Sequence, residues 1–149
     1  MVPLPADLLG VEGVQLGLTA TDKADAIDQC GRALLAVGAV SVEYLAAMHE
    51  REASVSTFIG EGVAIPHGTD AARAFVLRTS IVVLQFPEGV DWDGNQVTVC
   101  VGIAANGSEQ VGILSALAQV LMDPAKAAEL RSAADVDTVL TLLTFKENE

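Results

Sequence analysis

The chain has 149 residues, of which 51% are hydrophobic and only 4% aromatic. This length predicts one domain with a well-buried core, and the composition predicts a core of Ala, Val, Leu and Ile, as in layered α/β folds. Eight basic residues face 20 acidic ones, for a net charge of −12, which disfavours nucleic acid as a partner. The same charge favours solubility, and it would equally suit the steering of a basic protein partner.

No apolar run approaches the roughly 18 residues of a membrane helix. The first residues also lack the basic and then apolar pattern of a secretory signal. Cys30 and Cys100 each lie in an apolar pattern, so we expect two buried thiols rather than a disulfide framework. Together these features predict a cytoplasmic protein that is not itself inserted in the membrane.

Predicted strands and helices alternate along the chain. Alternating hydrophobicity predicts a strand over residues 12–19, and helical spacing predicts helices over 22–37 and about 42–52. Short strands over 54–59 and 62–65 and a helical turn over 70–75 follow. Apolar runs predict buried strands over 78–86 and 97–104, with turns at 87–89 and 93–95. Three helices, from 106, from 124 and over roughly 136–144, end this order.

This order predicts an α/β fold, a single domain in which helices cover both faces of a sheet. Asp22 or Thr21 is expected to cap the first helix, and Asp123 with Pro124 to begin the fourth. Ser41 is the expected cap of the second helix. The inward faces are predicted from helical spacing: Ile27, Cys30, Leu34 and Val37 in the first helix, Val42, Leu45 and Met48 in the second, and Val111, Leu114, Ala118 and Leu121 in the third.

The segment from Gly60 to Thr69 carries the strongest candidate for chemistry. An apolar run stops at Pro66, and His67 and Gly68 follow directly. Histidine exchanges protons near neutral pH and can act as a covalent nucleophile. The proline restricts the backbone before the ring, and the glycine leaves room for a partner to approach. His67 is therefore predicted to carry a group; the alternative is a structural histidine that bonds to a carbonyl.

Other polar residues near this segment have two interpretations each. Arg51 ends the second predicted helix, where its guanidinium could clamp a phosphoryl group or simply interact with the helix dipole. Glu61 could orient the imidazole or be a solvated turn residue. Thr57, with Ser54 and Ser56, could donate hydrogen bonds to an oxyanion or face solvent.

Residues 106–110 begin a helix directly after a buried strand, a position that suits an anion but also an ordinary capped helix. No metal is expected, because the spacing of His49 and His67 matches no metal-ligand pattern. No cofactor is expected either.

Residues 51–69 resemble the active-site region of enzyme IIA components of the bacterial sugar phosphotransferase system, mannitol/fructose class. The core of the resemblance is Gly-x-x-Ile-Pro-His-Gly-Thr, residues 62–69. Residues 83–90 and 101–105 resemble the mannitol-type branch in particular. The resemblance runs from about Leu9 to Leu143, and we expect one such domain over residues 1–149.

This resemblance implies a phosphotransferase that works through a phosphohistidine. His67 would accept a phosphoryl group on ring nitrogen Nε2 from the phosphocarrier protein HPr and pass it to a cysteine of the enzyme IIB domain. The IIB domain would phosphorylate a sugar, with mannitol expected, as the membrane IIC component imports it. Arg51 would steady the phosphoryl group, and the implied fold is a mixed sheet between helices. Thr57, Glu61 and Gly68 complete the expected binding site.

Gln110 departs from the family pattern. Mannitol-type members often carry a second active-site histidine at this position, whereas an amide can donate a hydrogen bond but brings no charge. Two alternatives remain open from the sequence. One is a regulatory phosphoprotein of the same family, which binds protein partners according to its phosphorylation state. The other is a non-catalytic domain with a structural His67.

Overall fold

The structure, a computed structural model, describes residues 9–105, 107–121 and 123–143. In this part of the chain five strands form one sheet in the order β1-β4-β5-β3-β2. Pairs β1–β4 and β3–β5 are parallel, whereas β4–β5 and β2–β3 are antiparallel, so the predicted mixed sheet is confirmed. The strands are β1 (Val14–Gln15), β2 (Phe58–Gly60), β3 (Val63–Ala64), β4 (Ser80–Trp92) and β5 (Asn95–Ala104).

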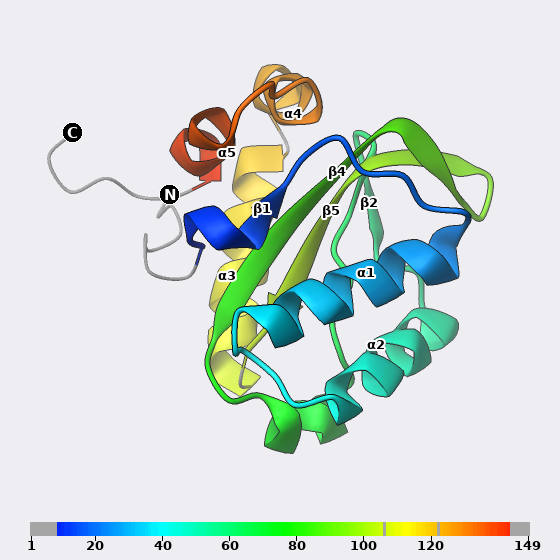
Figure 1. The fold of residues 1–149 in the computed structure, drawn as a ribbon, viewed down its shortest axis with the longest axis vertical. Coiled ribbons are helices and arrows are strands. Elements are labelled where there is room, and N and C mark those ends of the chain that lie inside the picture. Colours follow the sequence, from blue (N-terminus) through cyan, green and yellow to red (C-terminus); the bar gives the residue numbers. More distant parts are fainter. Residues whose placement is uncertain (1–8, 106, 122, 144–149) are drawn as a thin grey trace, which may run out of the picture.

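Helices lie on both faces of this sheet, as predicted (Figure 1). Helices α1 (Lys23–Ala36) and α2 (Glu43–Ser54) pack on one face. Helices α3 (Gly107–Leu121), α4 (Pro124–Arg131) and α5 (Val136–Leu143) pack on the other. Short 3₁₀ helices span η2 (Val11–Gly13) and η3 (Asp70–Phe75). No helix within the described ranges has the length and apolar character needed to cross a membrane.

Two apolar cores follow from the alternation of side chains along the long strands β4 and β5. Ile81 and Val83 point into the core beneath α3, α4 and α5, whereas Val82 and Leu84 point into the core beneath α1 and α2. Both cysteines are buried free thiols in the second core, as predicted. A hydrogen bond with Cys30, followed by burial, raises the pKa of the Cys100 thiol well above its ordinary value.

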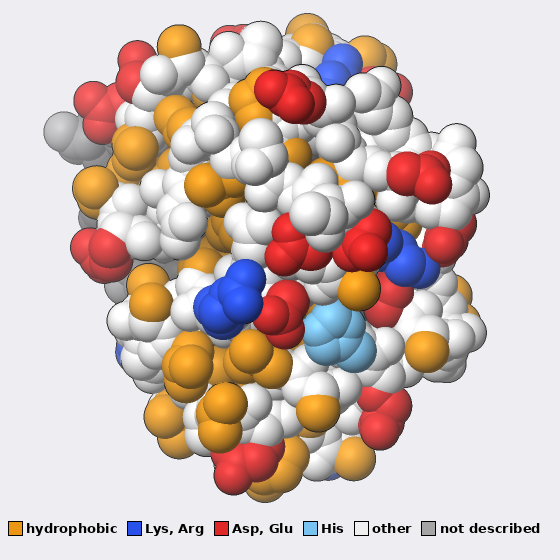
Figure 2. Space-filling view, turned by 45° about the vertical axis from the view of Figure 1, so that its right-hand side comes forward, with side chains coloured by type: hydrophobic (Ala, Val, Ile, Leu, Met, Phe, Trp, Pro, Cys, Tyr) orange, Lys and Arg blue, Asp and Glu red, His pale blue; other side chains and the backbone are white. Residues whose placement is uncertain are grey.

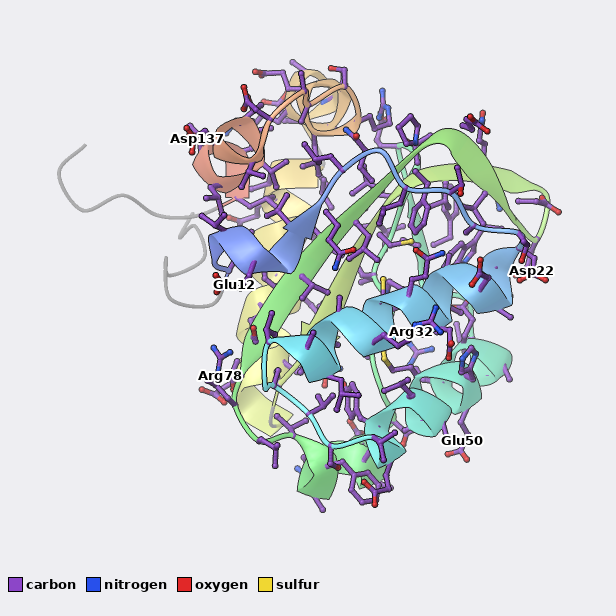
Figure 3. All side chains as sticks on the ribbon, in the orientation of Figure 1. Glu12, Asp22, Arg32, Glu50, Arg78 and Asp137 are labelled. Atoms are coloured by element: carbon purple, nitrogen blue, oxygen red, sulfur yellow. The ribbon has the colours of Figure 1, made fainter. Side chains whose placement is uncertain are left out.

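Among the described residues, the Asp, Glu, Lys and Arg side chains other than Glu52 lie outside the buried cores. The labelled examples in Figure 3, among them Glu12, Asp22 and Glu50, project from the outer surfaces of the ribbon. Figure 2 shows acidic side chains scattered across one whole face, with fewer basic ones between them, in agreement with the net charge of −12.

Several predicted boundaries are confirmed. Asp22 caps α1 by accepting from the backbone N–H of Asp25 at 2.8 Å. Asp123 caps α4, and Pro124 occupies its first turn. Residues 70–75 form the predicted helical turn. These signals are local in sequence, which is why they could be read without tertiary information.

Other predicted boundaries were wrong. The strand expected over 12–19 reduces to β1, and the strand expected from residue 54 begins at Phe58 because α2 continues to Ser54. The turn expected at 87–89 does not end a strand. There β4 continues to Trp92 through an irregularity that shifts its register against β5 between Gln85 and Val90. Such irregularities accommodate proline and glycine inside a strand.

The inward faces of two helices also differ from the prediction. Val42 precedes α2 and is 62% exposed, and the buried stripe of α2 runs through Tyr44, Ala47 and Met48 instead. The N-cap position of α2 is Val42, which makes no side-chain cap hydrogen bond, so the expected cap at Ser41 is wrong. In α3 Val111 is 70% exposed, and the buried positions include Ile113, Ala116, Leu117, Val120 and Leu121. Val42 lies just before α2, so it takes no part in the helical stripe. In α3 apolar residues occupy most positions from Val111 to Leu121, and hydrophobic spacing alone does not decide which of them face inward.

The packing between β5 and α1 gives a first testable prediction. A Cβ added at Gly102 would lie 2.9 Å from Cγ2 of Val82 and 3.3 Å from Cβ of Cys30. We therefore expect Gly102→Ala to lower the free energy of unfolding by about 1–3 kcal/mol through overpacking. Gly112→Ala is the matched control, since nothing lies within 4 Å of its added Cβ and alanine favours a helix. Urea denaturation of both variants measures their free energies of unfolding. A Gly102→Ala variant as stable as Gly112→Ala would contradict the close packing around Gly102.

Candidate functional site

His67 lies at the carboxyl end of two parallel strands. Residues Val63 and Ala64 pair with Val99 and Cys100 of β5, and His67 continues the same register by bridging to Ile103. This arrangement brings the ring to the edge of the sheet at which β5 ends and α3 begins, the edge where open α/β sheets bind ligands.

The imidazole of His67 is held by one specific hydrogen bond. Its Nδ1 lies 2.7 Å from the carbonyl oxygen of Ile65, and the residue is only 4% exposed. A carbonyl oxygen can only accept, so Nδ1 must carry the proton. In the neutral ring Nε2 then carries the lone pair and is the nucleophilic nitrogen.

Electrostatics favour that neutral ring. Burial, the largest effect, lowers the pKa of His67 below its ordinary value, while the hydrogen bond to Ile65 raises it. The positive charge of Arg51 lowers this pKa further. The negative charges of Glu52 and Asp70 act in the opposite direction and more weakly. The net result is an imidazole that is unprotonated, and so able to attack an electrophile, at neutral pH.

A second clamp holds the backbone around the ring. The hydroxyl of Tyr44 donates to the carbonyl of Ile103 at 2.9 Å and accepts from the backbone N–H of Gly68 at 2.8 Å. A Cβ at position 68 would lie 2.6 Å from Cε1 of Tyr44, so Gly68 permits this close approach. The backbone after His67 is thereby tied to both α2 and β5.

Arg51 lies in the last turn of α2, and its charge acts on His67. The Nη1 of Arg51 donates to the carbonyl of Val55 at 2.6 Å, which positions the guanidinium at the helix end. Among the described residues this is its single side-chain hydrogen bond, and a guanidinium has five N–H donors. The remaining donors are available for an anion that arrives at His67.

Gln110 lies in the first turn of α3 and is half-buried. The neighbouring Glu109 accepts a hydrogen bond of 2.6 Å from the hydroxyl of Thr79, which ties this turn to the residue just before β4. Ser80 at the start of β4 pairs with Ala104 at the end of β5. Gln110 therefore belongs to the same edge of the sheet as His67.

Two expected site residues are placed differently. Glu61 lies in the β2–β3 turn, where its backbone carbonyl and carboxylate bond Arg131. From Val63 to His67 the parallel register advances four residues, about 13 Å at ~3.3 Å per residue. Glu61 lies beyond Val63, so the expectation that it orients the imidazole does not hold. An extended strand separates residues that are only six apart in sequence.

Thr57 is buried, and its hydroxyl donates to Glu52 rather than facing an open site. The expectation that Thr57 donates to an oxyanion is corrected accordingly. Ser54 and Ser56 are exposed, and Ser56 accepts from the backbone N–H of Phe58. His49 pairs with Asp28 at 3.4 Å instead of joining His67. Within the described part of the chain, no group of three or more His, Cys, Asp or Glu side chains is placed to hold a metal ion.

Sequence reasoning missed Tyr44 and Glu52. Both lie on the buried stripe of α2 with Met48, at spacings of four residues. A tyrosine and a glutamate on an inward helix face each require a partner when buried. That spacing was the available signal, but the partners come from distant segments.

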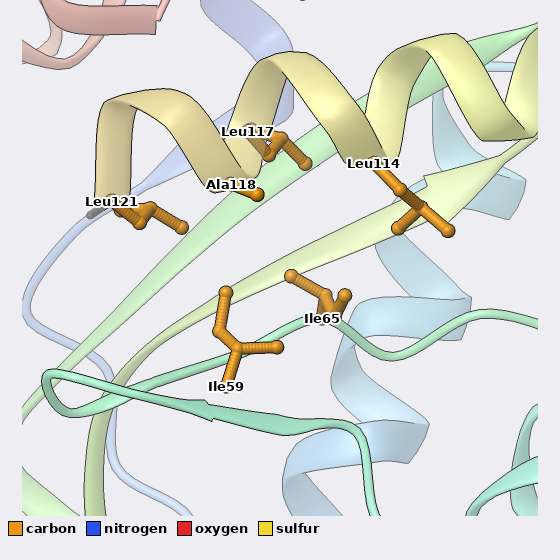
Figure 4. A pocket seen from close by; sticks show the side chains of 6 residues that line it. All are labelled: Ile59, Ile65, Leu114, Leu117, Ala118 and Leu121. Carbon is orange, nitrogen blue, oxygen red and sulfur yellow. The ribbon is translucent and has the colours of Figure 1, made fainter.

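An apolar groove begins beside His67, between α3 and the β2–β3 hairpin (Figure 4). Ile65, whose carbonyl holds the His67 ring, lines one wall, and Leu114 of α3, one turn beyond Gln110, lines the other. The complete lining is Ile59, Ile65, Leu114, Leu117, Ala118 and Leu121. Apolar surface next to a reactive side chain is typical of a surface that receives a protein partner.

Comparison with known proteins now identifies the family. A family model, described as phosphoenolpyruvate-dependent sugar phosphotransferase system, EIIA 2, matches residues 7–146. The chain belongs to this EIIA 2 family. It is 44% identical over 113 residues to the mannitol-specific phosphotransferase enzyme IIA component of Staphylococcus aureus strain N315, covering 76% of this chain and 78% of that protein.

A longer relative shares the same region. The multiphosphoryl transfer protein of Escherichia coli O157:H7 is 44% identical over 136 residues, which is 91% of this EIIA chain but only 36% of that protein. The present chain therefore spans about a third of that relative.

Solved structures of mannitol-type IIA proteins have the same fold as this chain. The crystal structure of IIA mannitol from Escherichia coli matches with a TM-score of 0.84 and 37% identity, covering 91% of this chain and 98% of that one. A complex of enzyme IIAMTL with phosphorylated enzyme IIBMTL, also from Escherichia coli, matches with a TM-score of 0.85 and 37% identity. The match covers 91% of this chain and 98% of the matched chain in that complex. The resemblance to the mannitol-type branch is thus confirmed.

The Tyr44 clamp gives a second prediction. We expect Tyr44→Phe to lower the free energy of unfolding by about 1–3 kcal/mol, because the buried N–H of Gly68 and carbonyl of Ile103 lose their shared partner. Urea denaturation followed by circular dichroism measures this loss. A variant as stable as the parent would show that the hydroxyl does not hold the backbone beside His67.

The lowered pKa of His67 gives a third prediction. Below about pH 6.5 the unfolded chain takes up a proton at this residue more readily than the folded protein does. Folding stability associated with His67 is therefore fully present above the unfolded pKa and is lost as the pH falls through it. Urea denaturation between about pH 5 and about pH 7.5 should show a shallower loss in His67→Gln than in the parent. Identical pH slopes would contradict a lowered pKa.

Proposed function

We propose that this EIIA protein is a phosphoryl carrier for sugar uptake, in which His67 accepts a phosphoryl group from phosphorylated HPr and passes it to a cysteine of an enzyme IIB domain. The single observation that carries the proposal is the hydrogen bond from Nδ1 of His67 to the Ile65 carbonyl, which leaves the Nε2 lone pair on a buried neutral ring. The match to mannitol-specific relatives supports mannitol as the sugar.

In the forward step Nε2 of His67 attacks the phosphorus in line, the Nε2–P bond forms, and the bond from phosphorus to the donor breaks. Nδ1 keeps its proton and its bond to Ile65 throughout, so the positive charge that develops on the ring is stabilised by the carbonyl. Little covalent work falls to the protein in such a transfer, and positioning with charge stabilisation supplies the catalysis. In the second step the cysteine thiolate of IIB attacks the phosphorus in line, the S–P bond forms, the Nε2–P bond breaks, and Nε2 of His67 regains its lone pair.

Arg51 and Gln110 are the proposed partners of the transferred group. The uncommitted N–H groups of Arg51 can bind two phosphoryl oxygens in parallel, and a bidentate contact of this kind is strong and directional. The amide of Gln110 can donate one further hydrogen bond without charge. A phosphoryl group would therefore be held mainly by one cation, which suits a carrier that must release it again.

The apolar groove beside His67 is the proposed contact surface for these protein partners (Figure 4). Apolar contacts of modest area permit short-lived complexes, and the acidic surface favours fast encounter with a basic partner. A complex of a similar protein with phosphorylated enzyme IIBMTL supports a IIB domain as one partner. Through that domain the protein would serve the membrane IIC component from the cytoplasm.

The fourth prediction tests the carrier role directly. With enzyme I, HPr and labelled phosphoenolpyruvate, the parent protein should acquire an acid-labile, base-stable label. His67→Ala should acquire none, because the attacking nitrogen is gone, and Arg51→Ala should be labelled at least about tenfold more slowly. His49→Ala is the matched control, since it removes the other histidine and should be labelled normally. A label that survives in His67→Ala would contradict the proposal.

A further inference from the structure

Glu52 is a buried acid that the proposed reaction does not use. Only 4% of its side chain is exposed, although it immediately follows Arg51 in α2. Four groups donate to its carboxylate or pair with it. They are the backbone N–H of Thr57 at 3.1 and 3.2 Å, the hydroxyl of Thr57, the indole N–H of Trp92 at 3.1 Å, and the ammonium of Lys23 at 3.7 Å. Donors on every side are the pattern expected around an ionised carboxylate.

These contacts connect to the His67 ring through one backbone–backbone hydrogen bond and one hydrogen bond from the ring to a backbone carbonyl. Glu52 holds Thr57 by both its N–H and its hydroxyl. The carbonyl of Thr57 accepts from the N–H of Ile65 at 3.0 Å. The carbonyl of Ile65 in turn accepts from Nδ1 of His67 at 2.7 Å. A continuous series of hydrogen bonds therefore connects the Glu52 carboxylate to the acceptor of the imidazole proton.

Glu52 also contributes charge at the ring. The charged groups that act on His67 are Arg51 and Glu52 from α2 and Asp70 from η3. Arg51 lowers the pKa of His67, whereas Glu52 and Asp70 raise it. Arg51 and Glu52, which are adjacent in α2, therefore shift the pKa of His67 in opposite directions.

The other contacts of Glu52 anchor it outside α2. Trp92 lies at the end of β4, and Lys23 opens α1 and also bonds the carboxylate of Asp93 at 2.9 Å. The β4–β5 turn and the start of α1 therefore converge on one carboxylate. This places Glu52 in a rigid setting, which a residue that orients another requires.

We propose that Glu52 is a positioning residue for phosphoryl transfer: through Thr57 and Ile65 it sets the orientation and the tautomer of His67, so that Nε2 faces the incoming phosphorus. The inference rests on the proposed function and deepens it. Glu52 touches neither the phosphoryl group nor the partner protein. Its effect is on the rate of transfer within the complex rather than on the formation of the complex.

The fifth prediction uses Glu52→Gln with Glu50→Gln as the matched control. Both changes remove one negative charge from α2, but Glu50 is exposed and projects away from the sheet (Figure 3). In Glu52→Gln an amide N–H₂ faces groups that already donate, so the hold on Thr57 is weakened. We expect kcat for phosphoryl transfer from phosphorylated HPr to fall at least about tenfold with KM within about twofold. Glu50→Gln should match the parent.

A second readout needs no phosphoryl donor. Nitrogen-15 NMR of the His67 ring reports which ring nitrogen carries the proton and at what pH the ring titrates. In Glu52→Gln we expect a smaller fraction of the Nδ1–H tautomer and a further decrease in the pKa of His67, since a carboxylate that raises it has gone. A purely structural Glu52 would lower the unfolding free energy yet leave ring tautomer, ring pKa and kcat of the folded protein unchanged. That result would overturn the inference.

Thr57→Val provides an independent variant should Glu52→Gln fold poorly. It removes the hydroxyl bond to Glu52 but keeps the backbone N–H and carbonyl of residue 57. We expect the same changes in ring tautomer and kcat, with smaller amplitude. A ring signal identical to that of the parent would count against the inference.

The two readouts separate this inference from the proposed function. If the parent protein is not phosphorylated but the ring tautomer shifts in Glu52→Gln, the carrier role fails and the orientation of His67 by Glu52 stands. If the parent is phosphorylated and Glu52→Gln equals Glu50→Gln in ring signals and kcat, the carrier role stands and the orientation by Glu52 fails.

Discussion

The site depends on the parallel pairing of residues 63–67 with β5. Val63 lies opposite Val99, and the isolated bridge of His67 with Ile103 keeps the same register, so the ring lies where β5 ends. Pro66 adds to this pairing by accepting from the N–H of Ile103 at 2.9 Å. The other contacts of the site, including the hydrogen bond from Nδ1 to the Ile65 carbonyl, form only when residues 63–67 keep this register against β5. A shift by one residue would turn the imidazole to the other face of the sheet.

Burial and charge act on the same ring with unequal strength. Removing the imidazole from water disfavours its protonated form, and this is the largest effect on the pKa of His67. The surrounding charges partly cancel, because Arg51 opposes Glu52 and Asp70. In the proposed reaction the balance changes once a phosphoryl group adds negative charge: Arg51 then attracts the group while the two carboxylates repel it. Such a balance favours a phosphoryl group that is bound transiently and passed on.

The site also illustrates how one helix can serve two purposes. The last turn of α2 carries Arg51, the proposed partner of the phosphoryl group, whereas the buried stripe of α2 supplies Tyr44 and Glu52 to the backbone that carries His67. The hydroxyl of Tyr44 holds the residue after the histidine, and Glu52 acts on the residues before it. The histidine is thus held from both sides by buried hydrogen bonds, which are costly to break in an apolar environment.

The sequence by itself determined those features whose signals are local. The caps at Asp22 and Asp123, the buried strands of β4 and β5, and the layering of helices on both faces all follow from neighbouring residues and hydrophobic period. The motif over residues 62–69 also indicated His67 and the family. Tertiary structure alone decided which polar groups meet. Glu52 accepts a hydrogen bond from Trp92, forty residues away, and Tyr44 donates one to Ile103. An extended strand separates Glu61 from His67. The physical reason is that a buried hydrogen bond depends on the relative placement of segments distant in sequence, which no local pattern encodes.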